Sequence, residues 1–415
     1  MRPLLDHSIS VEEISRLIGI KIDLDPSLMF SGATSSDSDV VEGDLFLAYP
    51  GEKTHGARFA SSALSRGARA ILTDSEGATI AEGLPVIVVS DARTAGALIS
   101  ATLYAKPMQE MISIGITGTN GKTTVSTLLY QLFQEAGRES GLIGTVESRI
   151  GRDSVASART TPEADALQAL AATMSERHLR HLVMEVSSHA LSMNRVKASH
   201  FAMVGFTNLS QDHLDFHKDM ESYFKAKAAL FSYEYADFGF INIDNEYGAR
   251  LATECQIPVA TLSRSNTVAQ WHFTQIHPIS SGAEISIRGN GGILIESKTS
   301  LLGGYNLDNL LMAVAMAHES GIDPIEIAAL IPSLTGAPGR FEAISLGQNF
   351  TALVDYAHSP DSVTRVLAAL RESTAGKVIE APTAASMRST TRVSPTETFS
   401  CRPPALTIAY TVCSF

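Results

Sequence analysis

The residues with the clearest chemical meaning form a glycine-rich run that ends in lysine and threonine. Gly118-Thr119-Asn120-Gly121-Lys122-Thr123-Thr124 follows the apolar run Met111–Ile114. Glycines let backbone N–H groups surround phosphates, and the next helix directs its positive end at them. Lys122 would neutralise the β- and γ-phosphates, and the Thr123 hydroxyl would reach Mg²⁺. Ile116 stands where the strict Walker spacing has glycine. The run therefore predicts a variant phosphate loop for ATP and Mg²⁺, and the alternative is a turn that merely contains Gly-Lys-Thr.

A second candidate is an acidic residue near the end of a buried strand. The segment His181–Val186 is apolar except at its ends and carries Glu185. A buried carboxylate is costly unless it is paired or bound to a metal. Downstream of a phosphate loop, Glu185 is predicted to be a Mg²⁺ ligand. The alternative is a salt-bridged structural glutamate.

Two histidines and two lysines follow further along the chain. His213 and His217 are four residues apart with an aspartate between them, a spacing that could suggest a transition-metal site. No third ligand motif of that kind follows, so we expect His213 to join the Mg²⁺ site and His217 to have a structural or surface role. The amphipathic helix predicted over residues 223–231 carries Lys225 and Lys227, which its pattern does not distinguish.

Composition narrows the classes of function. A chain of 415 residues is expected to form two or three domains. It has no apolar run of about 20 residues and no signal-peptide pattern, so we expect no membrane partner. Its three cysteines, Cys255, Cys401 and Cys413, form neither a disulfide framework nor a metal spacing, which fits a reducing cytoplasm. A net charge of −12 argues against nucleic acid as a partner.

The order of strand and helix patterns predicts a multi-domain α/β protein. Residues 1–107 form a small α/β domain with strands near 43–48, 68–73 and 85–89 and a helix that begins after Asp91. Residues 108–336 alternate strands with helices, which predicts a mostly parallel sheet, and end in an antiparallel hairpin over 283–296. Residues 337–380 begin a third unit. The segment 381–415 is rich in Ser, Thr, Pro and Ala, lacks a usable period before 406–410, and is predicted to be disordered.

The motifs taken in order resemble a known family. The phosphate loop is followed by Thr160-Thr161-Pro162-Glu163, Met-Glu-Val-Ser-Ser-His, Asn-Leu-Ser-Gln-Asp-His-Leu-Asp and Tyr-x-x-Ala-Lys-x-x-Leu-Phe, and then by Tyr-Asn-Leu-Asp-Asn, Pro-Gly-Arg-Phe-Glu and Asp-Tyr-Ala-His. Over about residues 30 to 380 this series resembles the Mur ligases, and more narrowly the MurE type, which adds the third amino acid to the peptidoglycan stem peptide. The resemblance implies a central P-loop ATPase domain, a small N-terminal UDP-binding α/β domain and an incomplete C-terminal Rossmann-like domain.

The resemblance also implies roles for single residues. Gly118 to Thr124 would bind ATP, and Thr123, Glu185 and His213 would hold Mg²⁺. Lys227 matches the lysine that reacts with CO₂ to become a carbamate ligand, and with Lys122, Glu185 and His213 it completes the implied catalytic set. The positions that match the UDP-muramoyl peptide site are Thr160, Thr161, Ser187 and Arg195, with Ser38 on the uridine side. The positions around adenosine and the phosphates are Asn306, Asn309, Arg340 and Asp355.

The implied reaction is ATP-dependent amide ligation. A diamino acid, meso-diaminopimelate or L-lysine, would be joined to UDP-N-acetylmuramoyl-L-alanyl-D-glutamate through an acyl phosphate, by a cytoplasmic monomer. The sequence does not select between the two amino acids. One alternative is another ligase of the superfamily, such as a folylpolyglutamate synthetase, which Glu-Val-Ser-Ser-His and Thr-Thr-Pro-Glu disfavour. The other is a defective protein that binds ATP and the UDP-peptide without ligating them.

Three departures from the family pattern stand out. The Asp-Ser-Arg signature ends in Asp39, so a basic contact near the uridine nucleotide is absent or supplied elsewhere. Arg159 precedes Thr160 where many relatives have asparagine. Beyond Ile379, the Asp-Asn-Pro-Arg and Gly-Lys-Gly-His-Glu motifs do not follow, as after a frameshift or premature end. From this we expect the amino-acid site to be largely missing and the activity to be impaired.

Overall fold

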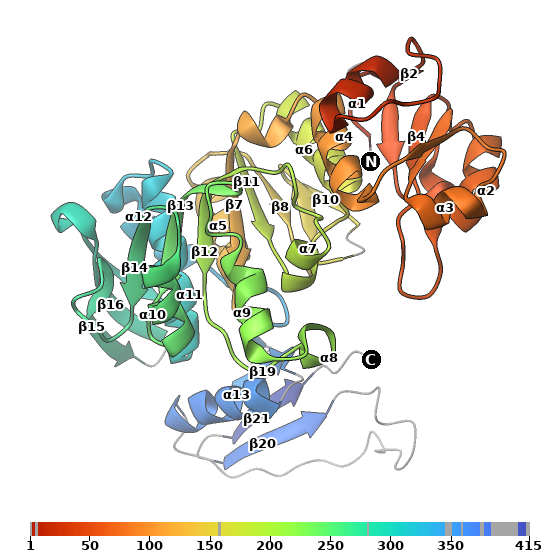
Figure 1. Ribbon diagram of the computed structural model, residues 1–415. Helices are drawn as coiled ribbons and strands as arrows, with labels where there is room; N and C mark the ends of the chain where they lie inside the picture. Colours follow the sequence, from red (N-terminus) through yellow and green to blue (C-terminus); the bar gives the residue numbers. More distant parts are fainter. Residues whose placement is uncertain are drawn as a thin grey trace.

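The structure is a computed structural model that describes residues 2–4, 7–156, 159–279, 282–344, 351–357, 360–373, 377–382 and 406–411. Its strands form sheets of four, eleven and four strands in successive parts of the chain, together with a short two-stranded sheet near the N-terminus (Figure 1). No described helix is long and apolar enough to cross a membrane. The prediction of a multi-domain α/β fold is confirmed.

The first sheet is parallel, in the order β3-β4-β5-β6. The helix predicted after Asp91 is present, because the Asp91 carboxylate accepts hydrogen bonds from the backbone N–H groups of Arg93 and Thr94 at its first turn. The elements of this part are β1 (Ile9–Ser10), α1 (Val11–Ile18), β2 (Met29–Phe30), β3 (Gly32–Thr34), η1 (Asp37–Asp39), β4 (Asp44–Leu47), η2 (Gly56–Phe59), α2 (Ala60–Ser65), β5 (Ala70–Thr73), α3 (Ser75–Ile80), β6 (Val86–Val88), α4 (Ala92–Leu103) and η3 (Pro107–Gln109).

The central sheet has the order β10-β9-β8-β11-β7-β12-β13-β14-β15-β16-β17. Its strands are β7 (Ile112–Thr117), β8 (Ser140–Ile143), β9 (Ser148–Ile150), β10 (Asp153–Val155), β11 (His181–Glu185), β12 (Phe201–Phe206), β13 (Ala236–Asn242), β14 (Val259–Ser263), β15 (Trp271–Ile279), β16 (Gly282–Arg288) and β17 (Leu294–Thr299). Seven neighbouring strands, from β8 to β15, run parallel, as predicted. The predicted hairpin is β16 and β17, and β15 pairs with it antiparallel as a further strand.

Helices cover both faces of the central sheet. They are α5 (Lys122–Glu135), α6 (Ala164–Glu176), α7 (Ser188–Ser192), α8 (Leu214–His217), α9 (Met220–Ala228), α10 (Glu246–Glu254), α11 (Gly304–Glu319) and α12 (Pro324–Leu330), with short turns η4 (Asn290–Gly292) and η5 (Ile331–Ser333). One buried cluster joins α5 and α11 to the sheet through residues such as Leu128, Leu310 and Ile114. A second cluster joins α6 and α9 to it through residues such as Leu167 and Phe224. Two packed apolar faces thus fix the sheet between layers of helices.

The register of the parallel strands brings three strand ends together. Glu185 at the end of β11 pairs with Ile116 of β7, and Phe206 at the end of β12 pairs with Thr117. Strand β7 lies between β11 on one side and β12 on the other, so the order of the strands reverses at β7. Ligands of such sheets bind at the carboxyl ends of the strands where the order reverses. The fold therefore places the phosphate loop, Glu185 and residues 207–210 at one edge.

The first and second parts pack together through their helices. Ala169 and Ala172 of α6 belong to the same buried cluster as Ile99 and Leu103 of α4. A polar contact adds to this, because the Asp165 carboxylate of α6 accepts a hydrogen bond from the Ser35 backbone N–H at 2.8 Å. These contacts fix the N-terminal sheet against the central one.

The last sheet has the order β18-β19-β21-β20 and one helix. Its elements are β18 (Glu342–Ile344), β19 (Thr351–Asp355), α13 (Pro360–Ser373), β20 (Lys377–Pro382) and β21 (Leu406–Thr411). The strand predicted over 351–355, the following helix and the strand beginning at Lys377 are confirmed. Strand β21 covers the strand-like run of the segment 381–415 and pairs parallel with β19 and β20. The disorder predicted for residues 381–415 is therefore wrong for 381–382 and 406–411, which lie in β20 and β21, and the rest of that segment lies outside the described residues.

Candidate active site

Two glycines shape the phosphate loop between β7 and α5. Gly118 has φ +145° and Gly121 has φ +89°, values that side chains rarely adopt. A Cβ on Gly118 would lie less than 3.0 Å from Thr207 Oγ1, and one on Gly121 less than 3.0 Å from Asn309 Oδ1. Lys122 Nζ folds back over the loop and donates to the carbonyls of Gly118 (2.8 Å) and Thr119 (2.9 Å). The loop is thus closely packed, with its lysine at the start of α5 where phosphates bind.

The loop is held from the side by the segment after β12. Asn208 Oδ1 accepts from the Asn120 backbone N–H at 3.0 Å, and Asn208 Nδ2 donates to the Asn120 carbonyl at 3.1 Å. The Thr119 N–H donates to the Asn208 carbonyl at 2.8 Å, and the Thr207 hydroxyl donates to the Asn120 carbonyl at 2.6 Å. The sequence motif contained these residues, but their role was not predicted, because only the fold brings them beside the loop.

Glu185 is completely buried at the end of β11. Its Oε2 accepts from the hydroxyls of Thr123 (3.1 Å) and Thr145 (3.0 Å), and its Oε1 accepts from the Thr145 backbone N–H (2.7 Å). Within the described part of the chain Glu185 forms no ion pair, so the salt-bridged alternative does not hold there. A carboxylate beside a P-loop threonine offers the hard oxygen donors that Mg²⁺ prefers. The residues present therefore fit a magnesium ion.

The structure separates the two lysines of α9. The Lys227 side chain is only 1% exposed, and its Nζ donates to the Gly118 carbonyl at 2.9 Å and lies 4.7 Å from the centre of the Tyr223 ring. Burial, followed by the nearby charge of Lys122, lowers the pKa of Lys227 well below its usual value. Lys225 is 71% exposed at its side chain and pairs with Glu221 at 3.5 Å on the outer face of the helix.

The histidines gather beside α9. His213 has a left-handed backbone (φ +52°) and a 46% exposed side chain whose ring centre lies 4.8 Å from that of His189. Burial lowers the pKa of His213, the Asp212 carboxylate acts against this, and the charge of Lys122 adds to the lowering. His217 is buried, and its Nε2 lies 2.9 Å from Ser188 Oγ. Of the two roles expected for His217, the structural one is confirmed.

The predicted metal set contains few ordinary metal ligands. Across the described ranges no group of three or more His, Cys, Asp or Glu residues is arranged to hold a metal ion. Of the metal ligands predicted from the sequence, only Glu185 and His213 belong to these residue types. The other two predicted ligands are Thr123 and a modified Lys227. A metal bound here would therefore need the threonine, the modified lysine, waters or phosphate oxygens.

The residues expected to hold the peptide substrate lie next to Glu185. Thr160 Oγ1 is 3.0 Å from Thr145 Oγ1. The Thr161 hydroxyl donates to the Glu185 carbonyl at 2.8 Å and accepts from the Ser187 N–H at 3.1 Å. Ser187 Oγ in turn accepts from the Ala190 N–H at 3.1 Å and begins α7. Thr161 is thus bonded directly to the end of β11.

Arg195 belongs to a cluster of three arginines around one carboxylate. Glu163 lies 3.0 Å from Arg195, 2.8 Å from Arg93 of α4 and 3.3 Å from Arg159. One negative charge faces three guanidinium groups, which leaves an excess of positive charge between the first and second sheets. Arg159, which replaces the asparagine of many relatives, adds to that excess.

Ser38 lies apart from the other candidates, on η1 of the first sheet. Its hydroxyl is 2.9 Å from that of Ser36, and no hydrogen bond of the described residues joins it to the phosphate loop. The neighbouring Asp39, where the family has arginine, accepts a hydrogen bond at its carbonyl from Arg2 Nη2 at 2.7 Å. A basic group from the N-terminus therefore does lie beside this turn, although Arg2 also pairs with Asp44.

The residues expected around the nucleotide lie on α11 and at the start of the last sheet. Asn309 faces Gly121, and its Nδ2 is 3.4 Å from Asn306 Oδ1. The Asp355 carboxylate accepts from the backbone N–H groups of residues 341 and 357, both at 2.7 Å. Arg340 stacks on Tyr356 at 4.5 Å. Burial lowers the pKa of Lys122, the Glu185 carboxylate acts against this, and the charge of Arg340 adds to the lowering. Lys122 thus experiences charges from both the central and the last sheet.

Comparison with known proteins decides the family. Residues 116–317 match the Mur ligase middle domain, and residues 34–105 match the catalytic domain of the Mur ligase family. The chain is 42% identical over 380 residues to UDP-N-acetylmuramoyl-L-alanyl-D-glutamate–2,6-diaminopimelate ligase of Streptomyces coelicolor, covering 91% of this chain and 75% of the relative. The chain belongs to the Mur ligase family, in its MurE branch. It is an ATP-dependent ligase of peptidoglycan precursor synthesis.

Solved structures agree with this assignment. The solved structure of a UDP-N-acetylmuramoyl-L-alanyl-D-glutamate–2,6-diaminopimelate ligase matches this chain with a TM-score of 0.75 and 27% sequence identity. The match covers 90% of this chain and 76% of that one. Folylpolyglutamate synthase of Mycobacterium tuberculosis matches with a TM-score of 0.57 and 18% identity, over 71% of this chain and 73% of that one, which shows a common fold alone. The folylpolyglutamate alternative is therefore not favoured.

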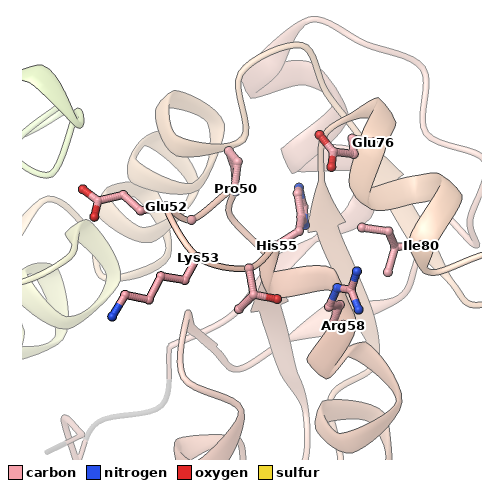
Figure 2. Close-up of a pocket in the computed structure, with 9 residues that line it drawn as sticks. Pro50, Glu52, Lys53, His55, Arg58, Glu76 and Ile80 are labelled. Carbon is pink, nitrogen blue, oxygen red and sulfur yellow. The ribbon is translucent and has the colours of Figure 1, made fainter.

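A separate cavity of about 520 Å³ lies in the first sheet of the Mur ligase. It is lined by Pro50–His55, Arg58, Glu76 and Ile80, and Figure 2 shows Glu52 and Lys53 extending away from the side on which Arg58 and Ile80 lie. Its buried His55 is already bonded to Asp74 and to the Ala57 N–H. None of the candidate residues lines this open hollow.

Proposed function

We propose that this ligase joins 2,6-diaminopimelate to the D-glutamate carboxylate of UDP-N-acetylmuramoyl-L-alanyl-D-glutamate. The names of its relatives support the choice of substrates. The observation that carries the proposal is the buried Lys227 on the Gly118 carbonyl, next to Lys122. This constellation joins an ATP site to an amine of lowered pKa, as the MurE resemblance requires.

The proposed reaction begins with activation of a carboxylate. A carboxylate is a poor electrophile, so its oxygen attacks the γ-phosphorus of ATP and ADP leaves, which produces an acyl phosphate. The amine nitrogen of diaminopimelate then attacks the acyl carbon, a tetrahedral intermediate collapses, and phosphate leaves with the formation of an amide. Lys122 stabilises charge on the transferring phosphoryl group, and catalysis is mainly positioning and charge neutralisation. Bound Mg²⁺, held by Thr123, Glu185 and His213, would supply Lewis-acid stabilisation of the phosphate oxygens.

Lys227 is proposed to carry a carbamate. The neutral amine attacks the carbon of CO₂, loses a proton to water and becomes an anionic carbamate, which can serve as an oxygen ligand. An amine must be unprotonated to react in this way, and burial beside Lys122 favours that form. The packing of Lys227 against Gly118 directs the modified group towards the phosphate loop.

The remaining assignments follow from the positions of the side chains. Thr160, Thr161, Ser187 and Arg195 would hold the muramoyl peptide, and Ser38 would contact the uridine side. The peptide site and the uridine site would lie along one elongated substrate that bridges the first and second sheets. Asn306, Asn309, Arg340 and Asp355 would bind the adenosine and phosphates. We propose domains over 1–107, 108–336 and 337–380, and a cytoplasmic monomer that binds neither nucleic acid nor membranes.

Release of phosphate by the purified chain tests the proposal. The reaction contains ATP, Mg²⁺ and UDP-N-acetylmuramoyl-L-alanyl-D-glutamate, and meso-diaminopimelate or L-lysine is added in turn. Release that depends on diaminopimelate supports the proposed function, whereas dependence on L-lysine would replace the amino acid in it. If ATP and the UDP-peptide bind but neither amino acid promotes release, this chain is a binding protein without ligase activity.

A further inference from the structure

We propose that Thr145 is a positioning residue that couples the Mg²⁺ site to the peptide site through one hydrogen-bonded chain. The chain runs from Thr160 through Thr145 to Glu185. The inference rests on the proposed function, because that function gives Glu185 and Thr160 their ligands. No sequence motif singled out Thr145.

The sheet register places Thr145 beside Glu185. Ile143, the last residue of β8, pairs with Met184 of β11, so the residues that follow them, Gly144 and Glu185, lie next to each other. A Cβ on Gly144 would lie 2.6 Å from Glu185 Oε1, which means that the backbone comes close to the carboxylate only because this residue is glycine. The Thr145 N–H then reaches Oε1 at 2.7 Å.

The direction of each hydrogen bond follows from the number of protons. The Thr145 hydroxyl has a single proton, and it donates that proton to Glu185 Oε2 at 3.0 Å. The contact of 3.0 Å between Thr145 Oγ1 and Thr160 Oγ1 must therefore have Thr160 as its donor. Thr160 then has only lone pairs left for a ligand, so its partner on the substrate is an N–H or O–H group. The buried carboxylate thus sets the polarity of the peptide site.

Loss of the Thr145 hydroxyl affects both ends of this chain. Glu185 Oε2 would keep the Thr123 hydroxyl, but the carboxylate would lose one of three hydrogen bonds that fix its orientation. Thr160 would lose its acceptor and could turn its proton towards the ligand. Replacement of a side chain that contacts only one of the two sites would weaken the binding of only one ligand.

Binding measurements on the full-length chain test the coupling. Thr145→Val removes the hydroxyl and keeps the backbone N–H, Thr145→Ser restores the hydroxyl, and Thr79→Val is a matched control whose exposed hydroxyl bonds only to the Ser75 carbonyl. Mn²⁺ binding in the presence of ADP is measured by electron paramagnetic resonance, and binding of the UDP-muramoyl dipeptide by calorimetry. We expect Thr145→Val to weaken both about tenfold, Thr145→Ser to stay within about twofold of the wild type, and Thr79→Val to change neither.

The outcomes distinguish failure of the coupling from failure of the proposed function. If the wild-type chain binds neither ligand, the proposed function is wrong. If the wild type binds both and Thr145→Val weakens one or none, the coupling is refuted. Equal losses in Thr145→Ser and Thr145→Val would also refute it, because the hydroxyl would not be responsible. Thr160→Val in both backgrounds gives a double-mutant cycle for dipeptide binding, where additive losses contradict the chain and non-additive losses support it. If Thr145→Val does not fold, Thr145→Ala replaces it in every comparison.

Discussion

Replacement of Gly118 by alanine tests whether the close packing of the phosphate loop is needed for nucleotide binding. A side chain at φ +145° costs about 1 to 3 kcal/mol. The new Cβ would also press on the Thr207 hydroxyl and lie 3.1 Å from the backbone N and O of Asn208. Thr207 cannot move aside freely, because it donates to the Asn120 carbonyl at 2.6 Å and would lose about 1 kcal/mol with that bond. The unliganded loop can relieve this cost by leaving the packed conformation, and ADP binding must then restore it, so a total of about 3 kcal/mol corresponds to a loss of about 100-fold in affinity.

Calorimetric titration with ADP and Mg²⁺ measures this loss. Gly137→Ala is the matched control, because Gly137 lies at the other end of α5 with φ +69° and has nothing within 4 Å of an added Cβ. It should cost about 1 kcal/mol of stability and leave ADP affinity within about twofold. Adding Thr207→Ala to Gly118→Ala removes one of the contacts and should recover about tenfold. Wild-type affinity in Gly118→Ala would refute the reasoning.

Three further predictions concern Lys227, His181 and Asn208. Lys227→Ala should reduce phosphate release at least about 100-fold and remove the carbamate signal seen by NMR with ¹³C-labelled bicarbonate, while the exposed Lys225→Ala stays within about threefold; equal losses would contradict the carbamate assignment. Burial lowers the pKa of His181 from 6.5 to about 4, so the unfolded chain takes up this proton first as the pH falls, and the folded state loses up to about 3 kcal/mol between pH 6.5 and 4. The free energy of unfolding of His181→Leu should fall by about 3 kcal/mol less than that of the wild type over this pH range, measured by Trp271 fluorescence during unfolding in urea. If the free energies of unfolding of the two proteins change in parallel with pH, this account is wrong. Asn208→Asp turns the donor that faces the Asn120 carbonyl into an acceptor, and should weaken ADP binding about tenfold in the titration used above, with no effect expected if the side chain only fills space.

Local sequence patterns predicted those features that depend on neighbouring residues. The phosphate loop was visible because glycines cluster directly after an apolar run, and the buried position of Glu185 because it ends another such run. The helix after Asp91 and the hairpin of β16 and β17 were predicted from capping and alternation. Each of these signals lies within about ten residues of chain, where propensity and periodicity act.

Features that depend on distant residues could not be predicted in the same way. Lys225 and Lys227 share a helix whose pattern does not distinguish them, whereas in the fold Lys227 is buried against the Gly118 carbonyl, 109 positions away, and Lys225 is exposed beside Glu221. Thr145 contacts a carboxylate 40 positions away and lies in no recognisable motif. Arg2 donates to the carbonyl of Asp39, 37 positions away. The register of parallel strands determines such contacts, and that register is set by packing rather than by local sequence.

The sharing of one carbonyl by two lysines supports Lys227 as the amine for the proposed reaction with CO₂. Gly118 O accepts from Lys122 at 2.8 Å and from Lys227 at 2.9 Å. Two ammonium ions on one oxygen repel each other, and the more deeply buried one loses more by being charged. Burial is the larger cause and the charge of Lys122 the next, while only Asp212 acts in the opposite direction on the pKa of Lys227. A carboxylate paired with Lys227 would have kept that amine protonated and unreactive. No described residue forms such a pair with Lys227, so only Asp212 opposes the lowering of its pKa. The unprotonated amine that the proposed reaction needs would have both a proton to donate to Gly118 and a lone pair for CO₂.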